Sequence, residues 1–141
     1  MKLNIIFICL ILTFCGVVFA NLQATDPQIS RNFRQSEFVS PDTGEAKMDM
    51  QVIINLQVVR DHFGKKVVVI SGYRTSRHNR NIGGHSESLH LKGMAVDWYI
   101  EGVSVYEMAR VAKECGFTGI GIYKYSVHTD IGERETWYGG S

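Results

Sequence analysis

The chain is poor in the residues that would indicate an unusual architecture. Its 141 residues include only two prolines and three cysteines, and 15 Lys and Arg residues nearly balance 14 Asp and Glu residues. This balance lacks the positive excess with which proteins bind nucleic-acid phosphates, so we expect no nucleic-acid partner. The apolar share of 45% is ordinary for a globular protein, and the length fits one compact domain.

The first twenty residues have the layout of a secretory signal peptide. Lys2 supplies one positive charge, residues 3–18 carry none, and Ala20 is a small residue at the expected cleavage position. The apolar run is shorter than the roughly 20 residues that span a bilayer, which makes a retained anchor the weaker alternative. We therefore predict a signal peptide over residues 1–20, a mature domain over residues 21–141, a secreted or periplasmic location, and no stable membrane anchor after cleavage.

Cleavage after Ala20 would remove Cys9 and Cys15 and leave Cys115 as the only cysteine. A single cysteine cannot form a disulfide within the chain, which excludes a small fold held together by disulfides. Cys115 falls near the end of a predicted helix, where a small apolar residue is a better interpretation than a catalytic thiol. A bound metal would help to hold the loops of such a domain.

Apolar periodicity predicts two main helices and four short strands. The helices are expected over residues 49–63 and 104–114, each with a glycine close behind its end. The strands are expected over residues 67–70, 94–100, 119–123 and 127–131. Between them, residues 21–34 are interpreted as a loosely held arm, residues 71–93 as a long loop, and residues 132–141 as a tail without periodicity. We predict one α+β domain with a small, mostly antiparallel sheet.

Two histidines and an aspartate are spaced as metal ligands could be. His90 ends the long loop, and Asp97 follows seven residues later within a predicted strand. His128 and Asp130 lie on a later strand and project to the same side, because side chains alternate with a period of two. Two imidazoles and a carboxylate suit catalytic zinc, which keeps a fourth position for water. The spacing alone is a weak signal, since any His and Asp can fall that far apart.

The flanking residues carry a family resemblance. The motifs are Ser71-Gly72-Tyr73-Arg74, Ser88-x-His90-x-x-Gly93-x-Ala95-x-Asp97, Gly121-Ile122-Tyr123 and Val127-His128-Thr129-Asp130. Together they closely resemble the zinc D-alanyl-D-alanine carboxypeptidase family, whose fold is shared with the signalling domain of hedgehog proteins. The resemblance covers roughly residues 33–137, and the His-x-Asp ending is similar to that of a subgroup of small cell-wall endopeptidases.

The resemblance implies roles for individual residues. His90, Asp97 and His128 match the ligands of a Zn²⁺ ion. Arg74 matches an arginine that holds a substrate carboxylate or carbonyl oxygen, a task that suits a planar, permanently charged guanidinium. Without the family, an ion pair that fixes the long loop would be the simpler interpretation of Arg74. Ser88 is a further candidate for substrate binding, or for a hydrogen bond within its loop.

One position departs from the family pattern. Many relatives carry a catalytic Asp or Glu three residues before the last zinc histidine, where this chain has Tyr125. Asp130 is the nearest substitute as catalytic base, and it is equally interpreted as the acceptor that orients a zinc imidazole. The weaker candidates for a proton relay, all on predicted loops, are Glu87, Glu133 and His85. Trp137 is expected in the core rather than in a cleft wall.

The predicted function is that of a secreted zinc metallopeptidase, a hydrolase of the D,D-carboxypeptidase or endopeptidase type. The expected substrates are peptidoglycan stem peptides or cross-links, and the expected state is a monomer. D-Ala-D-Ala, L-Ala-D-Glu and diaminopimelate bonds are all open as the bond that is cleaved. The alternative is a catalytically inactive zinc-containing binding module of the same fold, which Tyr125 keeps open.

Overall fold

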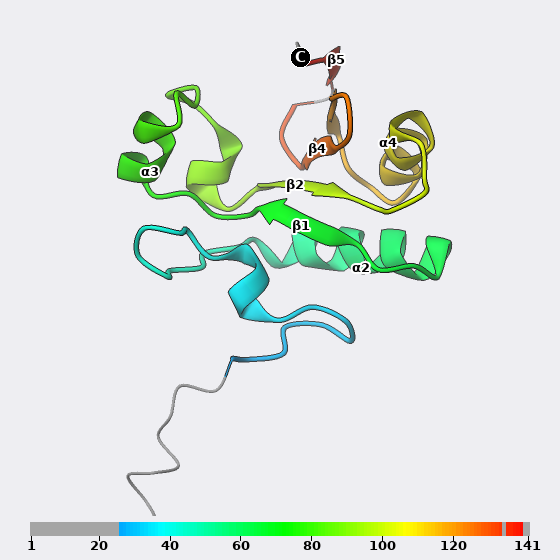
Figure 1. Ribbon diagram of the computed structural model, residues 1–141, viewed down its shortest axis with the longest axis horizontal. Helices are drawn as coiled ribbons and strands as arrows, with labels where there is room; N and C mark the ends of the chain where they lie inside the picture. The colour runs from blue at the N-terminus through cyan, green and yellow to red at the C-terminus, as the bar shows by residue number, and fades with distance from the viewer. Residues whose placement is uncertain (1–25, 134, 140–141) are drawn as a thin grey trace, which may run out of the picture.

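The computed structural model describes residues 26–133 and 135–139, so the predicted signal peptide lies outside the described residues. A five-stranded sheet forms the centre of this region, with the strand order β1-β2-β4-β3-β5 (Figure 1). The strands are β1 (Val68–Ser71), β2 (Ala95–Tyr99), β3 (Gly119–Ile122), β4 (Val127–Asp130) and β5 (Glu135–Tyr138). The first four pair antiparallel, whereas β5 runs parallel to β3 at one edge. The predicted α+β class is confirmed, and the sheet is mixed.

The two predicted main helices are present with nearly the expected bounds. Helix α2 (Met50–Phe63) begins where the Asp49 side chain accepts a hydrogen bond from the Gln51 amide, and it ends at Gly64 with φ of 60°. Helix α4 (Val105–Glu114) begins at Ser104, whose side chain accepts from the Glu107 amide. Such caps satisfy amide groups that have no partner within the helix. No helix among the described residues has the length and hydropathy to cross a bilayer.

Helices α2 and α4 bury one face of the sheet and leave the other open. The apolar core joins alternate strand residues such as Val96, Trp98 and Ile120 to Leu56 of α2 and Met108 of α4. Because successive strand side chains point to opposite faces, the residues between them face away from both helices. Figure 1 shows α4 on one side of the strands and α3 (Ser76–Asn81) on the other.

Three segments contain structure that the sequence did not predict. The loop over residues 71–93 contains α3 and the 3-10 helix η2 (Leu89–Lys92), and the tail contains β5. The prediction of a loosely held arm over residues 21–34 is wrong for its described part, because the Phe33 side chain is wholly buried in the core. The 3-10 helix η1 (Gln35–Phe38) follows directly and buries Phe38 against the Phe33 ring.

Candidate metal centre

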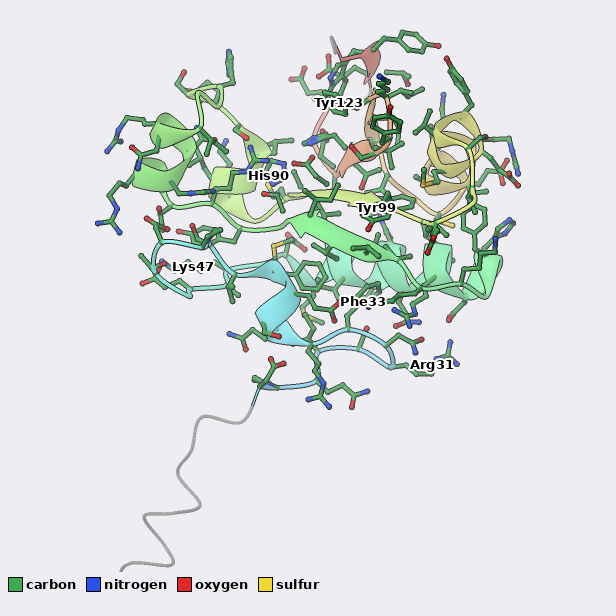
Figure 2. All side chains as sticks on the ribbon, in the orientation of Figure 1. Arg31, Phe33, Lys47, His90, Tyr99 and Tyr123 are labelled. Carbon is green, nitrogen blue, oxygen red and sulfur yellow. The ribbon has the colours of Figure 1, made fainter. Side chains whose placement is uncertain are left out.

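The open face of the sheet presents Asp97 and His128 side by side. Asp97 of β2 and His128 of β4 are direct partners in the antiparallel register. His90 approaches them from η2 (Figure 2), whose residues contact β2. The His90 side chain is almost wholly buried. Three side chains from two strands and one helical turn therefore meet at one point.

The donor atoms of these three residues converge at short distances. His90 Nε2 lies 3.2 Å from His128 Nδ1 and 3.2 Å from Asp97 Oδ2, and His128 Nδ1 lies 2.8 Å from Asp97 Oδ1. Around a tetrahedral zinc ion with bonds of about 2.05 Å, ligand atoms lie about 3.3 Å apart. The cluster is thus able to hold a metal ion, and its spacing is close to what zinc requires.

The outward nitrogen of each imidazole is fixed by an acceptor. His90 Nδ1 lies 2.7 Å from the carbonyl oxygen of Gly72, so this nitrogen carries the hydrogen and donates it. His128 Nε2 lies 3.2 Å from Asp130 Oδ2 and donates in the same way. In its neutral form, each ring then turns a lone pair toward the cluster. This arrangement of an outer acceptor behind each imidazole is typical of metal-binding histidines.

The electrostatics of the cluster couple Asp97 to His128. Burial by itself raises the pKa of Asp97, but hydrogen bonds and charges from His128 and His90 outweigh burial and hold that pKa well below its usual range. Burial likewise lowers the pKa of His128, yet the carboxylates of Asp130 and Asp97 outweigh it and raise the pKa to about 9. Because a metal binds the neutral imidazole, binding at the cluster would release the proton that the raised pKa retains on His128.

The geometry of Asp130 favours one of the two roles left open by the sequence. Asp130 is buried, its Oδ1 accepts a hydrogen bond from the Gly132 amide at 2.8 Å, and its Oδ2 contacts His128. Both oxygens are engaged, and the contact with His128 is made on the ring nitrogen that faces away from the cluster. An orienting acceptor fits these contacts, whereas a general base needs an oxygen on the metal side.

Two glycines of β3 leave room for the site. A Cβ at Gly119 would lie 2.2–2.5 Å from the Asp130 carboxylate group, and a Cβ at Gly121 would lie 2.8–2.9 Å from the Trp137 indole. Both glycines face the open side, because they pair in register with Asp130 and His128. Sequence reasoning overlooked these roles, although glycines at alternate positions of a predicted strand are a usable signal for close approach.

A cavity of about 430 Å³ opens over the cluster. Its lining includes the three candidate ligands and Asp130. It also includes four further candidates for substrate binding or proton transfer that the sequence indicated, namely Arg74, His85, Glu87 and Ser88. Tyr125, which is 72% exposed, and Glu133 are not part of the lining. Glu135 and Tyr123 line the cavity and were not predicted to do so.

The expectation that Trp137 belongs to the core is wrong. Its side chain is half-buried, lines the cavity and lies outside the core cluster. The reason is that β5 pairs parallel to β3 in a register that opposes Trp137 to Gly121, which places the indole on the open face. Tyr138, the next residue, is 72% exposed.

Arg74 forms an ion pair and also lines the cavity, so its contacts fit both interpretations from the sequence, a loop-fixing ion pair and a substrate-binding residue. Its Nη2 donates to Asp97 Oδ2 at 2.6 Å, and its Nε donates to Ser71 Oγ at 2.8 Å. The side chain is only 14% exposed, yet it lines the cavity. Since a guanidinium has five N–H donors, two contacts leave others for a second anion.

Comparison with known proteins places this geometry in context. The family model described as Peptidase M15 matches residues 25–132. The peptidoglycan L,D-endopeptidase MepK of Escherichia coli K12 is 35% identical over 80 residues, which are 52% of this chain and 44% of that protein. The probable peptidoglycan L,D-endopeptidase MepK of Haemophilus influenzae is 32% identical over 103 residues, 66% of this chain and 55% of that protein. The chain spans about half the length of the curated relatives it matches.

Proposed function

The chain belongs to the peptidase M15 family, and on this premise we propose that it is a zinc-dependent peptidase that hydrolyses peptide bonds of peptidoglycan. The substrate class follows from the two relatives, which are named as peptidoglycan endopeptidases. We further propose that the domain acts outside the cytoplasm, since residues 1–20 have the composition of an export signal.

One observation carries the proposal more than any other. Nε2 of His90, Nδ1 of His128 and the carboxylate of Asp97 face one another within 3.2 Å, and each imidazole is held from behind by an acceptor. With those acceptors behind them, the neutral forms of both imidazoles direct a lone pair to the point that the Asp97 carboxylate also faces, which is the arrangement of three metal ligands. Three protein ligands beside an open cavity are typical of catalytic rather than structural zinc.

The chemistry that zinc supplies at such a site is polarisation of a carbonyl oxygen and a lower pKa for a water molecule. Arg74 would bind the substrate beside it, with the guanidinium N–H groups that Asp97 and Ser71 leave free. A permanently charged guanidinium at a cavity wall can hold a substrate carboxylate or stabilise a developing oxyanion. Ser88, also on the cavity lining, is proposed as a further substrate contact.

A proton acceptor is the second requirement of hydrolysis. The carboxylates that line the cavity are Asp97, Asp130, Glu87 and Glu135, and the first two are engaged with the histidines. Glu135 lies on β5, which β3 separates from the ligand strand β4. Glu87 lies three residues before His90 on the segment that brings His90 to the cavity. We therefore assign the proton transfer to Glu87.

The proposed function is tested with purified peptidoglycan. The protein would be incubated with sacculi of several wall types, with and without a zinc chelator, and the soluble peptides would be identified by mass spectrometry. Release that the chelator abolishes and added zinc restores is the expected result, and the peptide masses identify the bond. His90→Ala should release nothing, whereas His62→Ala, on the exposed surface of α2, should behave as wild type.

One result of the peptidoglycan experiment would refute the proposed peptidase activity. Zinc bound at the cluster without release from any wall type would overturn the peptidase proposal. It would favour the alternative, a zinc-containing binding module, for which the exposed Tyr125 at the usual position of a carboxylate is the supporting observation.

A further inference from the structure

One row of residues crosses the open face of the sheet through the metal cluster. Asp97 pairs with His128, His128 pairs with Gly121, and Gly121 pairs with Trp137. In-register neighbours on adjacent strands point to the same face, so all four positions are directed toward the cavity. Gly121 has no side chain, and the row is therefore empty between His128 and Trp137.

The Trp137 indole occupies this empty position. A Cβ at Gly121 would lie 2.8–2.9 Å from three atoms of the indole, which means that the ring lies directly over the glycine. The ring centroids of Trp137 and His128 are 5.3 Å apart, with the planes inclined at 48°. The indole thus reaches across β3 and contacts the imidazole of β4.

His128 is consequently held between two rings. The His90 ring lies on another side of it, with centroids 5.0 Å apart and planes inclined at 67°. Asp130 lies 3.2 Å from His128 Nε2 and Asp97 lies 2.8 Å from Nδ1, so these contacts hold the ring at its nitrogens and neither packs against a face of the ring. Contact with the indole adds a restraint on rotation of the ring, because turning the imidazole would drive it into Trp137 or His90.

We propose that Trp137 is a positioning residue of the metal site, which holds the plane of the His128 imidazole so that Nδ1 points at the position of the metal. The inference rests on the assignment of His128 as a ligand in the proposed function. It explains why the single tryptophan on β5 lies outside the core cluster and above a glycine. Neither the metal nor the substrate needs to contact the indole for this role.

The test compares Trp137→Ala, Trp137→Phe and Gly121→Ala with wild type. Zinc affinity would be measured by competition with a chromophoric chelator, and ligand geometry by the visible absorption spectrum of the protein loaded with Co²⁺ alone. Thermal unfolding would verify that each variant is folded. Tyr138→Ala is the matched control, because Tyr138 is the next residue of β5 and is 72% exposed.

We expect Trp137→Ala to weaken zinc binding by ~10-fold or more and to change the Co²⁺ spectrum, as loss of an orienting neighbour does. Trp137→Phe should restore most of the affinity. Gly121→Ala should resemble Trp137→Ala while keeping the tryptophan, since the added Cβ displaces the indole. Tyr138→Ala should match wild type in both measurements.

Wild-type zinc affinity and an unchanged Co²⁺ spectrum in folded Trp137→Ala and Gly121→Ala would overturn the inference. Both measurements are made without substrate. A protein that cleaves no peptidoglycan but loses zinc affinity on Trp137→Ala would therefore support this inference while refuting the proposed peptidase function.

Discussion

Asp97 and His128 face each other across the β2–β4 ladder, with Asp97 Oδ1 and His128 Nδ1 2.8 Å apart. Two of the three candidate ligands are thereby fixed by backbone pairing between strands buried on their other face. The third, His90, depends on η2 and on the carbonyl of Gly72 at the end of β1. The metal position is set chiefly by the sheet, and the loop completes it.

The ligand assignment predicts the metal content of single variants. His90→Ala, Asp97→Ala and His128→Ala should each reduce zinc from about one ion per chain to nearly none, because catalytic zinc with three protein ligands loses most of its affinity when one is removed. Each should also abolish the stabilisation that added zinc gives the wild type in thermal unfolding. Elemental analysis and melting curves measure both effects. Full zinc content in His90→Ala would refute the assignment.

Asp130 is predicted to act through His128. Asp130→Ala removes the acceptor behind the imidazole and should weaken zinc binding by ~10–100-fold. Asp130→Asn keeps a carbonyl oxygen and should weaken it less. A general base would give another pattern, a loss of ~10²–10⁴-fold in kcat for Asp130→Asn with zinc affinity unchanged. Zinc titrations and kcat at saturating zinc distinguish the two roles.

Glu87 is predicted to be the proton acceptor. Glu87→Gln keeps the size of the side chain, so kcat should fall by ~10²–10⁴-fold while zinc content and the melting temperature stay at wild-type values. Glu133→Gln is the control, because Glu133 is exposed and lies outside the cavity lining. If Glu135→Gln rather than Glu87→Gln shows the large loss, the acceptor lies on β5 instead.

Arg74 is predicted to bind the substrate through its planar guanidinium. Arg74→Lys keeps the charge but loses the paired N–H groups, so KM should rise by about 10-fold or more. Zinc content should change little, since the ligands remain. Arg80→Lys on the exposed surface of α3 is the control. Steady-state kinetics on a soluble peptide from the wall digest provide the measurement, and an unchanged KM would contradict the role.

Asp42 is predicted to stabilise the segment that carries Arg74. A hydrogen bond from Ser40 lowers the pKa of Asp42 to about 2, and hydrogen bonds from Thr75 and Arg77 add to this effect. A carboxyl whose pKa is lower in the folded state stabilises that state above the unfolded pKa of 3.8 and loses this effect as the pH falls through about 2.

Asp42→Asn should therefore melt at a lower temperature than wild type at neutral pH. The difference should stay constant down to about pH 4 and then shrink toward pH 2, where the wild-type carboxyl becomes protonated. Melting curves of both proteins across this range measure it. A difference that does not change with pH would show that the stabilisation comes from shape rather than charge.

The sequence predicted the segments in which apolar residues recur with a regular spacing. The helices α2 and α4, the strands β1 to β4 and the family were all recognisable, because apolar spacing and the His-x-Asp and Ser-Gly-Tyr-Arg motifs are local patterns. The face shared by His128 and Asp130 followed from strand alternation and is present as predicted.

What the sequence did not predict depends on tertiary contacts. Helix α3 consists of polar residues without an apolar stripe, and it is capped by Thr75 beside the Ser40–Asp42 turn, 33–35 residues away in the chain. Strand β5 pairs parallel to β3 at an edge, and no local signal in the tail specifies that partner. The placement of Trp137 in the cavity wall follows from this pairing.

The glycines at 119 and 121 have a consequence for reading mutational scans. Substitution at either position should be poorly tolerated, because any added side chain collides with Asp130 or with the Trp137 indole. The helix-facing residues between and after them, Ile120 and Ile122, should accept apolar replacements of similar volume. In a mutational scan of β3, the two most sensitive positions would therefore be glycines, which carry no functional group. Their sensitivity would reflect the space that neighbouring side chains occupy and not a chemical role.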